Sequence, residues 1–112
     1  MRDKLRMVIL GAGLCASAVA PAVEPVTIKM QKEAFVPART TVAAGTHITW
    51  TNTDTVPHSV TADNHFDSGP VLPGKTFEWM ADAAGTINYH CIFHPSMTAI
   101  LTVDATSGKA TK

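Results

Sequence analysis

Residues 86–97 of this 112-residue chain read TINYHCIFHPSM, and this stretch carries most of its chemical information. Its first half alternates polar and apolar residues, which is the pattern of a half-buried β-strand. Its second half places a thiol, an imidazole and a thioether at a Cys-x-x-His-x-x-Met spacing, as Cys91, His94 and Met97. Sulfur ligands beside imidazole suit copper, and cuprous copper in particular, better than any hard cation. The stretch therefore predicts a strand that ends in a metal-binding loop.

A second imidazole has to come from another part of the chain. Electron-transfer copper sites hold two histidines and one cysteine in a trigonal plane, with a weak axial methionine. His58 follows a strand-like run that contains Ile48 and Trp50, and it is the best candidate. His90 adjoins the cysteine and therefore points to the opposite face of an extended strand. His65 lies in the middle of a loop and fits the site less well.

The rest of the chain reads as short strands separated by turn residues. Alternating or β-prone runs occur at residues 26–30, 40–43, 47–52, 60–61, 76–80, 86–91 and 98–103. No stretch keeps apolar residues at helical spacing for three turns. Short strands spaced by Gly, Pro, Asn and Asp indicate an antiparallel sandwich or barrel. Trp50, Phe77 and Trp79 are the expected aromatic core residues.

The chain begins with a pattern typical of a secretory signal peptide. A basic start precedes an apolar run at residues 7–20, which ends in alternating alanines. The run is shorter than the ~20 apolar residues that a bilayer-spanning helix needs. We expect residues 1–18 to be the signal peptide, with cleavage as late as residue 22. Acylation of Cys15 is the less favoured alternative, because Leu14 rather than a small residue precedes it.

Removal of residues 1–18 sets the charge and the cysteine content of the mature chain. Three basic residues and one acidic residue leave, so nine positive and nine negative charges become six and eight, a net charge near −2. No basic stripe for nucleic acid remains. Cys91 is then the single cysteine, which leaves intermolecular pairing, a reactive thiol or a metal ligand as its roles. We assign residues 23–104 to one domain and expect residues 105–112 to be a disordered tail.

Beyond the cysteine loop, the chain resembles the cupredoxin family along nearly the whole mature sequence. The similarity is carried by the runs FVP (35–37), GTHITWTNTD (45–54), PHSV (57–60), FDSG (66–69), PGKTF (73–77) and GT (85–86). The loop spacing is that of the amicyanin type, because plastocyanin and pseudoazurin have longer loops before the methionine. The resemblance implies an all-β, antiparallel Greek-key β-sandwich of about six to eight strands.

The resemblance also implies roles for individual residues. One type 1 (blue) copper would be held by His58, Cys91 and His94 as in-plane ligands and by Met97 as the axial ligand. Asn52 is expected to tie the His58 loop to the cysteine loop by hydrogen bonds, since such partners orient metal ligands. An apolar patch for redox partners is expected around the second histidine, formed by Pro57, Phe93 and Pro95.

The resulting hypothesis is an exported, periplasmic protein that carries single electrons between redox proteins. We expect a monomer with no catalytic activity, no nucleic-acid partner and no stable membrane association. A copper chaperone or storage protein is the alternative function. Zinc is the alternative metal, although it would not need Met97. A multicopper oxidase is disfavoured because Ile92 stands where a second histidine would flank Cys91, and the chain contains no His-x-His pair.

Overall fold

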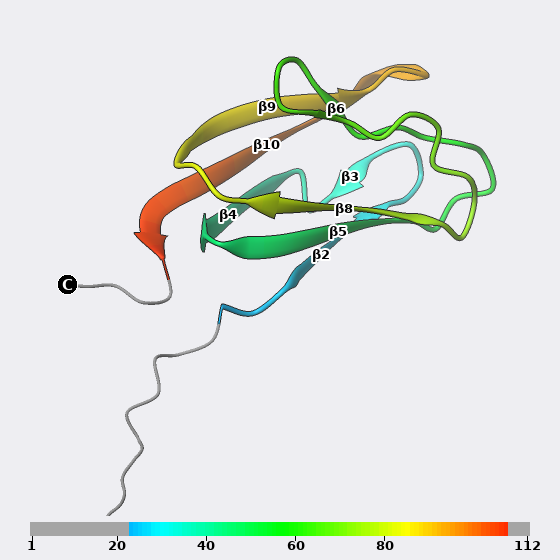
Figure 1. Ribbon diagram of the computed structural model, residues 1–112. Coiled ribbons are helices and arrows are strands. Elements are labelled where there is room, and N and C mark those ends of the chain that lie inside the picture. The colour runs from blue at the N-terminus through cyan, green and yellow to red at the C-terminus, as the bar shows by residue number, and fades with distance from the viewer. Residues whose placement is uncertain (1–22, 108–112) are drawn as a thin grey trace, which may run out of the picture.

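A computed structural model describes residues 23–107 of the chain (Figure 1). All regular structure in this part is β-strand, and no segment of it forms a helix of the length and apolarity needed to cross a membrane. The predicted signal peptide (1–18) and residues 108–112 of the predicted tail lie outside the described residues. The strands are β2 (Val26–Met30), β3 (Phe35–Val36), β4 (Arg39–Ala44), β5 (Thr46–Asn52), β6 (Thr61–Ala62), β7 (Phe66–Asp67), β8 (Thr76–Ala81), β9 (Gly85–Cys91) and β10 (His94–Ser107).

The strands form two packed sheets, which confirms the predicted all-β sandwich (Figure 1). One sheet has the order β4-β10-β9-β6-β7 and the other has the order β3-β2-β5-β8. Among the described strands, five of the seven pairs are antiparallel, as expected, whereas β4 pairs parallel with β10 and β2 pairs parallel with β5, so both sheets are mixed. Parallel neighbours need a crossover connection. Here the chain leaves the smaller sheet after β3, runs along the edge of the larger sheet as β4, and returns as β5.

The strand count also differs from the predicted six to eight. Nine strands are present in the described part of the chain, and three of them, β3, β6 and β7, contain only two residues each. Two residues cannot show an alternating pattern, so periodicity does not detect β3 and β7, whereas β6 overlaps the β-prone run predicted at residues 60–61. Strand β10 continues through Ser107, three residues into the segment predicted to be disordered, because Ser107 still pairs with Ala44 of β4.

The core lies between the sheets and is centred on Trp50. Alternation along β5 buries Ile48 and Trp50 completely, as the sequence predicted. The Trp50 ring contacts Tyr89 of β9, with ring centroids 5.6 Å apart, and Phe66 of β7 at the same separation. Burying an aromatic side chain of this kind stabilises the fold by roughly 1.5–3 kcal/mol. The rigid core therefore holds the ends of β5 and β9 in fixed relative positions.

Predicted core residues Phe77 and Trp79 are only half-buried. Both lie on β8, which is an edge strand of the smaller sheet, so one side of each ring remains open to solvent. They still pack against the core, since the Trp79 ring lies 4.8 Å from that of Phe66.

Strands β9 and β10 form the hairpin that carries the cysteine loop. Cys91 pairs with His94 across the turn, and His90 pairs with Thr98. Two adjacent residues of β9 are thus matched to two β10 residues that are four apart, so residues 95–97 bulge out of the ladder. The bulge places the Met97 side chain inside the protein, where it is 1% exposed.

Candidate metal centre

The predicted ligands gather at one end of the sandwich. Cys91 is the last residue of β9 and His94 is the first residue of β10. His58 comes from the connection between β5 and β6, more than thirty residues earlier in the chain. Its backbone is fixed by two hydrogen bonds with Val71: the His58 N–H donates to the Val71 carbonyl at 3.1 Å, and the Val71 N–H donates back at 2.7 Å.

Three donor atoms face one another across a small space. The Cys91 Sγ atom lies 3.8 Å from Nδ1 of His58 and 3.6 Å from Nδ1 of His94. The two imidazole rings are 4.9 Å apart between centroids. These three residues are the one group of His, Cys, Asp and Glu side chains in residues 23–107 with donor atoms all within 4.8 Å. Cys91 and His58 are buried, whereas the His94 side chain is 24% exposed.

Asp54 fixes the orientation of the His58 ring. Its Oδ2 atom lies 2.7 Å from Nε2 of His58. The carboxylate also accepts the backbone N–H groups of Lys32 at 2.7 Å and Glu33 at 3.0 Å. The Glu33 bond, followed by the bonds from His58 and Lys32, lowers the pKa of Asp54 from 3.8 to about 2 against the opposing effect of burial.

An ionised Asp54 can only accept hydrogen bonds, so the His58 proton resides on Nε2. The Nδ1 lone pair of His58 is then free and points at the Cys91 sulfur. A carboxylate on the far nitrogen of a metal-binding histidine is a common way to set its tautomer and raise its basicity. The sequence interpretation did not assign this role to Asp54.

Ser59 connects the His58 segment to the cysteine loop. Its backbone N–H donates to Cys91 Sγ at 3.3 Å, and its Oγ accepts the backbone N–H of Ile92 at 2.9 Å. The serine is fully buried, and its hydroxyl also pairs with Thr61 Oγ1 at 2.8 Å. The sequence interpretation missed Ser59, because one serine beside a histidine carries no distinctive signal.

The predicted bond between Asn52 and the cysteine loop is wrong. Asn52 is fully buried, and its Nδ2 group donates to the carbonyls of Val56 and Val71, both at 2.8 Å. Its Oδ1 atom accepts the Asp54 N–H at 2.9 Å. Asn52 therefore shapes the turn that carries Asp54 and fixes the segment against which His58 pairs. It supports the site from the His58 side only.

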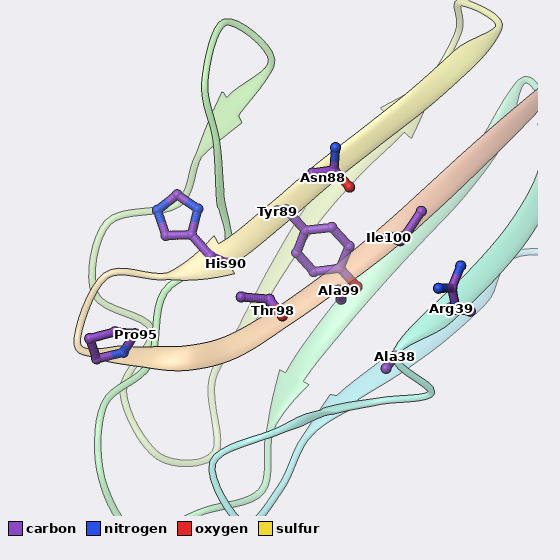
Figure 2. A pocket seen from close by; sticks show the side chains of 9 residues that line it. All are labelled: Ala38, Arg39, Asn88, Tyr89, His90, Pro95, Thr98, Ala99 and Ile100. Atoms are coloured by element: carbon purple, nitrogen blue, oxygen red, sulfur yellow. The ribbon is translucent and has the colours of Figure 1, made fainter.

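The remaining histidines of the described chain lie away from the donor cluster. His47 and His65 are exposed. His90 and Tyr89 project from opposite sides of β9, and His90 lines a shallow hollow on the outer face of the larger sheet (Figure 2). That hollow also contains Arg39 and Asn88, and it reaches the cysteine loop only at Pro95. The prediction that His90 points away from the metal ligands is thus confirmed.

The donor set fits a copper ion. One thiol and two imidazole nitrogens converge in a buried space, and the Ser59 N–H donates a hydrogen bond to the sulfur. Met97, which follows in the same loop, is as buried as Cys91. A thioether beside a thiolate and two imidazoles favours copper, whereas zinc would be satisfied by the thiolate and imidazoles and would not need Met97. The fold and the site together define a β-sandwich metalloprotein with a mononuclear copper centre.

Comparison with known proteins gives the same class. A family model described as a cupredoxin-like domain matches residues 4–103. Amicyanin-alpha of Methylorubrum extorquens is 32% identical over 87 residues, which make up 69% of this chain and 70% of the relative. The chain belongs to the cupredoxin-like family.

Solved structures are similar in fold. A purple cupredoxin from Nitrosopumilus maritimus is 28% identical, with a TM-score of 0.66 over 70% of this chain and 99% of that one. The Cu(I) form of an amicyanin variant is 22% identical, with a TM-score of 0.68 over 78% of this chain and 87% of that one. Family membership and the donor cluster together support a copper electron-transfer protein.

Proposed function

We propose that this chain is a mobile one-electron carrier of the periplasm, whose copper ion would be held by His58, Cys91, His94 and Met97. The observation that carries the proposal is the unequal burial of the ligands. His58 and Cys91 are 0% and 1% exposed, whereas the His94 side chain is 24% exposed. A carrier needs a centre that is closed to solvent except at one edge, where a partner can approach.

The hydrogen bonds around the ligands suit repeated electron transfer. Copper, when bound, supplies a one-electron Cu(II)/Cu(I) couple. The protein holds His58 through Asp54 and the backbone of Val71, and it holds Cys91 through Ser59. Ligands that are fixed from behind keep their positions when the charge of the metal changes. Little rearrangement then opposes the transfer.

Exposed apolar residues lie beside both histidine ligands in the sequence. Phe93 and Pro95 flank His94, and Val56 and Pro57 precede His58; the Phe93 side chain is 45% exposed, that of Val56 is 38% exposed, and both prolines are exposed. We call these four residues the apolar rim. Small interfaces of this kind are typical of brief electron-transfer encounters. We expect a redox partner to dock on this rim, which contains the three residues predicted for docking, Pro57, Phe93 and Pro95.

Voltammetry of the copper-loaded protein separates a carrier from a chaperone or storage protein. We expect a reversible one-electron wave, with copper retained through dialysis in both oxidation states. Met97→Leu should keep the wave and shift its potential, because leucine preserves the buried volume but removes the thioether ligand. Loss of copper on reduction, or an irreversible wave, would favour the chaperone or storage function instead.

Export and oligomeric state are tested on the protein made in a bacterial host. The basic and apolar pattern of residues 1–18 supports export. We expect the chain in the periplasmic fraction, with an N-terminus between residues 19 and 23 by mass spectrometry and a monomer by light scattering. Retention of the full-length chain in the cytoplasm would contradict the proposed location.

A further inference from the structure

The turn between β2 and β3 lies against the metal centre, although the function derived above does not use it. Its four residues run from Gln31 to Ala34 and are closed by two backbone hydrogen bonds of 2.9 and 3.1 Å. Lys32 and Glu33 at its centre both have positive φ, 55° and 56°. A two-residue hairpin turn with this backbone normally contains Asn or Gly. Something other than local preference must therefore hold these two residues in place.

Asp54 is the group that holds the turn. Its two carboxylate oxygens accept the N–H groups of Lys32 and Glu33 at 2.7 and 3.0 Å. The same carboxylate bonds the His58 ring at 2.7 Å. Because charge-assisted hydrogen bonds are short and strong, they offset the backbone strain of the turn. The turn is thus attached to the side of the metal centre that carries His58.

This attachment brings the Glu33 side chain to the other histidine. Glu33 Oε2 lies 3.8 Å from Nε2 of His94. Nδ1 of His94 faces Cys91 Sγ, so Nε2 is the nitrogen on the outer side of the ring. Each imidazole of the site therefore has a carboxylate at its outer nitrogen. Asp54 is hydrogen-bonded to the buried ring of His58 at 2.7 Å, whereas Glu33 lies 3.8 Å from the partly exposed ring of His94, beyond hydrogen-bond distance, and can act on that ring through its charge.

We propose that Glu33 is a positioning residue for His94, and that its carboxylate keeps the His94 proton on Nε2 and lowers the copper reduction potential. With the proton on Nε2, the Nδ1 lone pair is directed into the site. The negative charge beside the ring favours Cu(II) over Cu(I), since the oxidised ion carries the larger positive charge. The inference rests on the proposed ligand role of His94 and adds a residue that controls it.

The expected change in copper affinity follows from the usual effect of removing a group that supports a metal ligand. Removing such a partner costs about 10–100-fold in metal affinity. The Glu33 side chain is 60% exposed, so solvent screens its charge and the lower end applies. A tenfold loss of Cu(II) affinity with unchanged Cu(I) affinity corresponds to a rise of about 59 mV in a one-electron potential.

Glu33→Gln tests the proposal, with Asp104→Asn as the matched control. Asp104 is an exposed acid ten residues beyond His94 along β10, so its loss removes one negative charge far from the site. We expect Glu33→Gln to bind Cu(II) about tenfold more weakly and to raise the potential by about 59 mV, with Cu(I) binding unchanged. Asp104→Asn should change neither. Equal shifts in the two variants, or no shift in Glu33→Gln, would overturn the proposal.

Nitrogen NMR of the metal-free chain provides a readout that does not depend on copper. In the parent protein at pH 8 the His94 ring should carry its proton on Nε2, and Glu33→Gln should shift the population towards Nδ1. Unfolding curves show whether the variant keeps its fold. An unchanged tautomer population in a folded Glu33→Gln protein would refute the positioning role even if the chain proved not to be an electron carrier.

Discussion

Replacing Asp54 with asparagine should destabilise the metal-free protein in a pH-dependent way. Asparagine has nearly the same shape, but its amide group can accept only one of the two turn N–H groups and carries no charge. Asp54 has its pKa lowered from 3.8 to about 2, mainly by the Glu33 N–H, and this corresponds to at most about 2.4 kcal/mol of unfolding free energy at pH 7. Screening of the partly exposed carboxylate reduces the expected loss to about 1–2 kcal/mol.

The sign of the pH dependence follows from the direction of the pKa change. A carboxyl group with a lowered pKa in the folded state contributes stability that is complete above its ordinary pKa of 3.8 and is lost as the pH falls through about 2. Urea unfolding of metal-free parent and Asp54→Asn proteins should therefore show a gap at pH 7 that narrows below 3.8 and closes near 2. For a domain of this size, the gap corresponds to about 5–15 °C in Tm.

Asp104→Asn again serves as the control, because it removes an exposed carboxylate with no hydrogen-bond partner among residues 23–107 and should leave stability within about 0.5 kcal/mol of the parent. Two results would refute the reasoning about Asp54. One is an Asp54→Asn protein as stable as the parent at pH 7. The other is a stability gap that stays constant down to pH 2.

Three further outcomes are expected from other parts of the structure. Ser59→Ala removes the acceptor for the Ile92 N–H, so urea unfolding should show a loss of about 1–3 kcal/mol in the free energy of unfolding. The visible absorption band of the copper-loaded protein should persist, because the hydrogen bond from the Ser59 backbone to Cys91 remains. Tyr89→Phe removes a buried hydroxyl that has no hydrogen-bond partner within residues 23–107, so urea unfolding should show a stability that is unchanged or raised by up to about 1 kcal/mol. A stability loss of more than about 1 kcal/mol would show that the hydroxyl has a hydrogen-bond partner after all. Phe93→Glu places a negative charge on the apolar rim, so two copies that meet at their rims repel each other, and electron self-exchange measured by NMR line broadening should slow by about tenfold or more without a change in the visible spectrum. An unchanged rate would exclude the rim as the contact surface.

The local features of this protein could be predicted from its sequence. Alternation along β5 and β9 predicted which faces of these strands are buried, and Trp50 and Tyr89 follow that pattern. Cys91, His94 and Met97 belong to one short loop, so their spacing alone indicated a site. His58 required the fold to bring a distant segment to the same end of the sandwich, and the structure places it 3.8 Å from the sulfur.

The features that escaped prediction depend on contacts between distant segments. The parallel pairing of β2 with β5 is invisible in either strand alone, because alternation is the same for both directions. Asn52 was placed in the right neighbourhood and given the wrong partner, since the link to the cysteine loop comes from Ser59. The Lys32–Glu33 turn lacks the Asn or Gly that marks such turns, because Asp54, twenty-two residues from Lys32, holds it.

The visible absorption spectrum of the copper-loaded chain tests the central claim most directly. If Cys91 binds copper beside His58 and His94, one equivalent of Cu(II) should produce an intense thiolate-to-copper band. One electron per chain should bleach the band and reoxidation should restore it, whereas Cys91→Ser should remain colourless at every copper concentration. Colourless, redox-silent binding of copper by the parent protein, or a band of equal intensity in Cys91→Ser, would contradict the account.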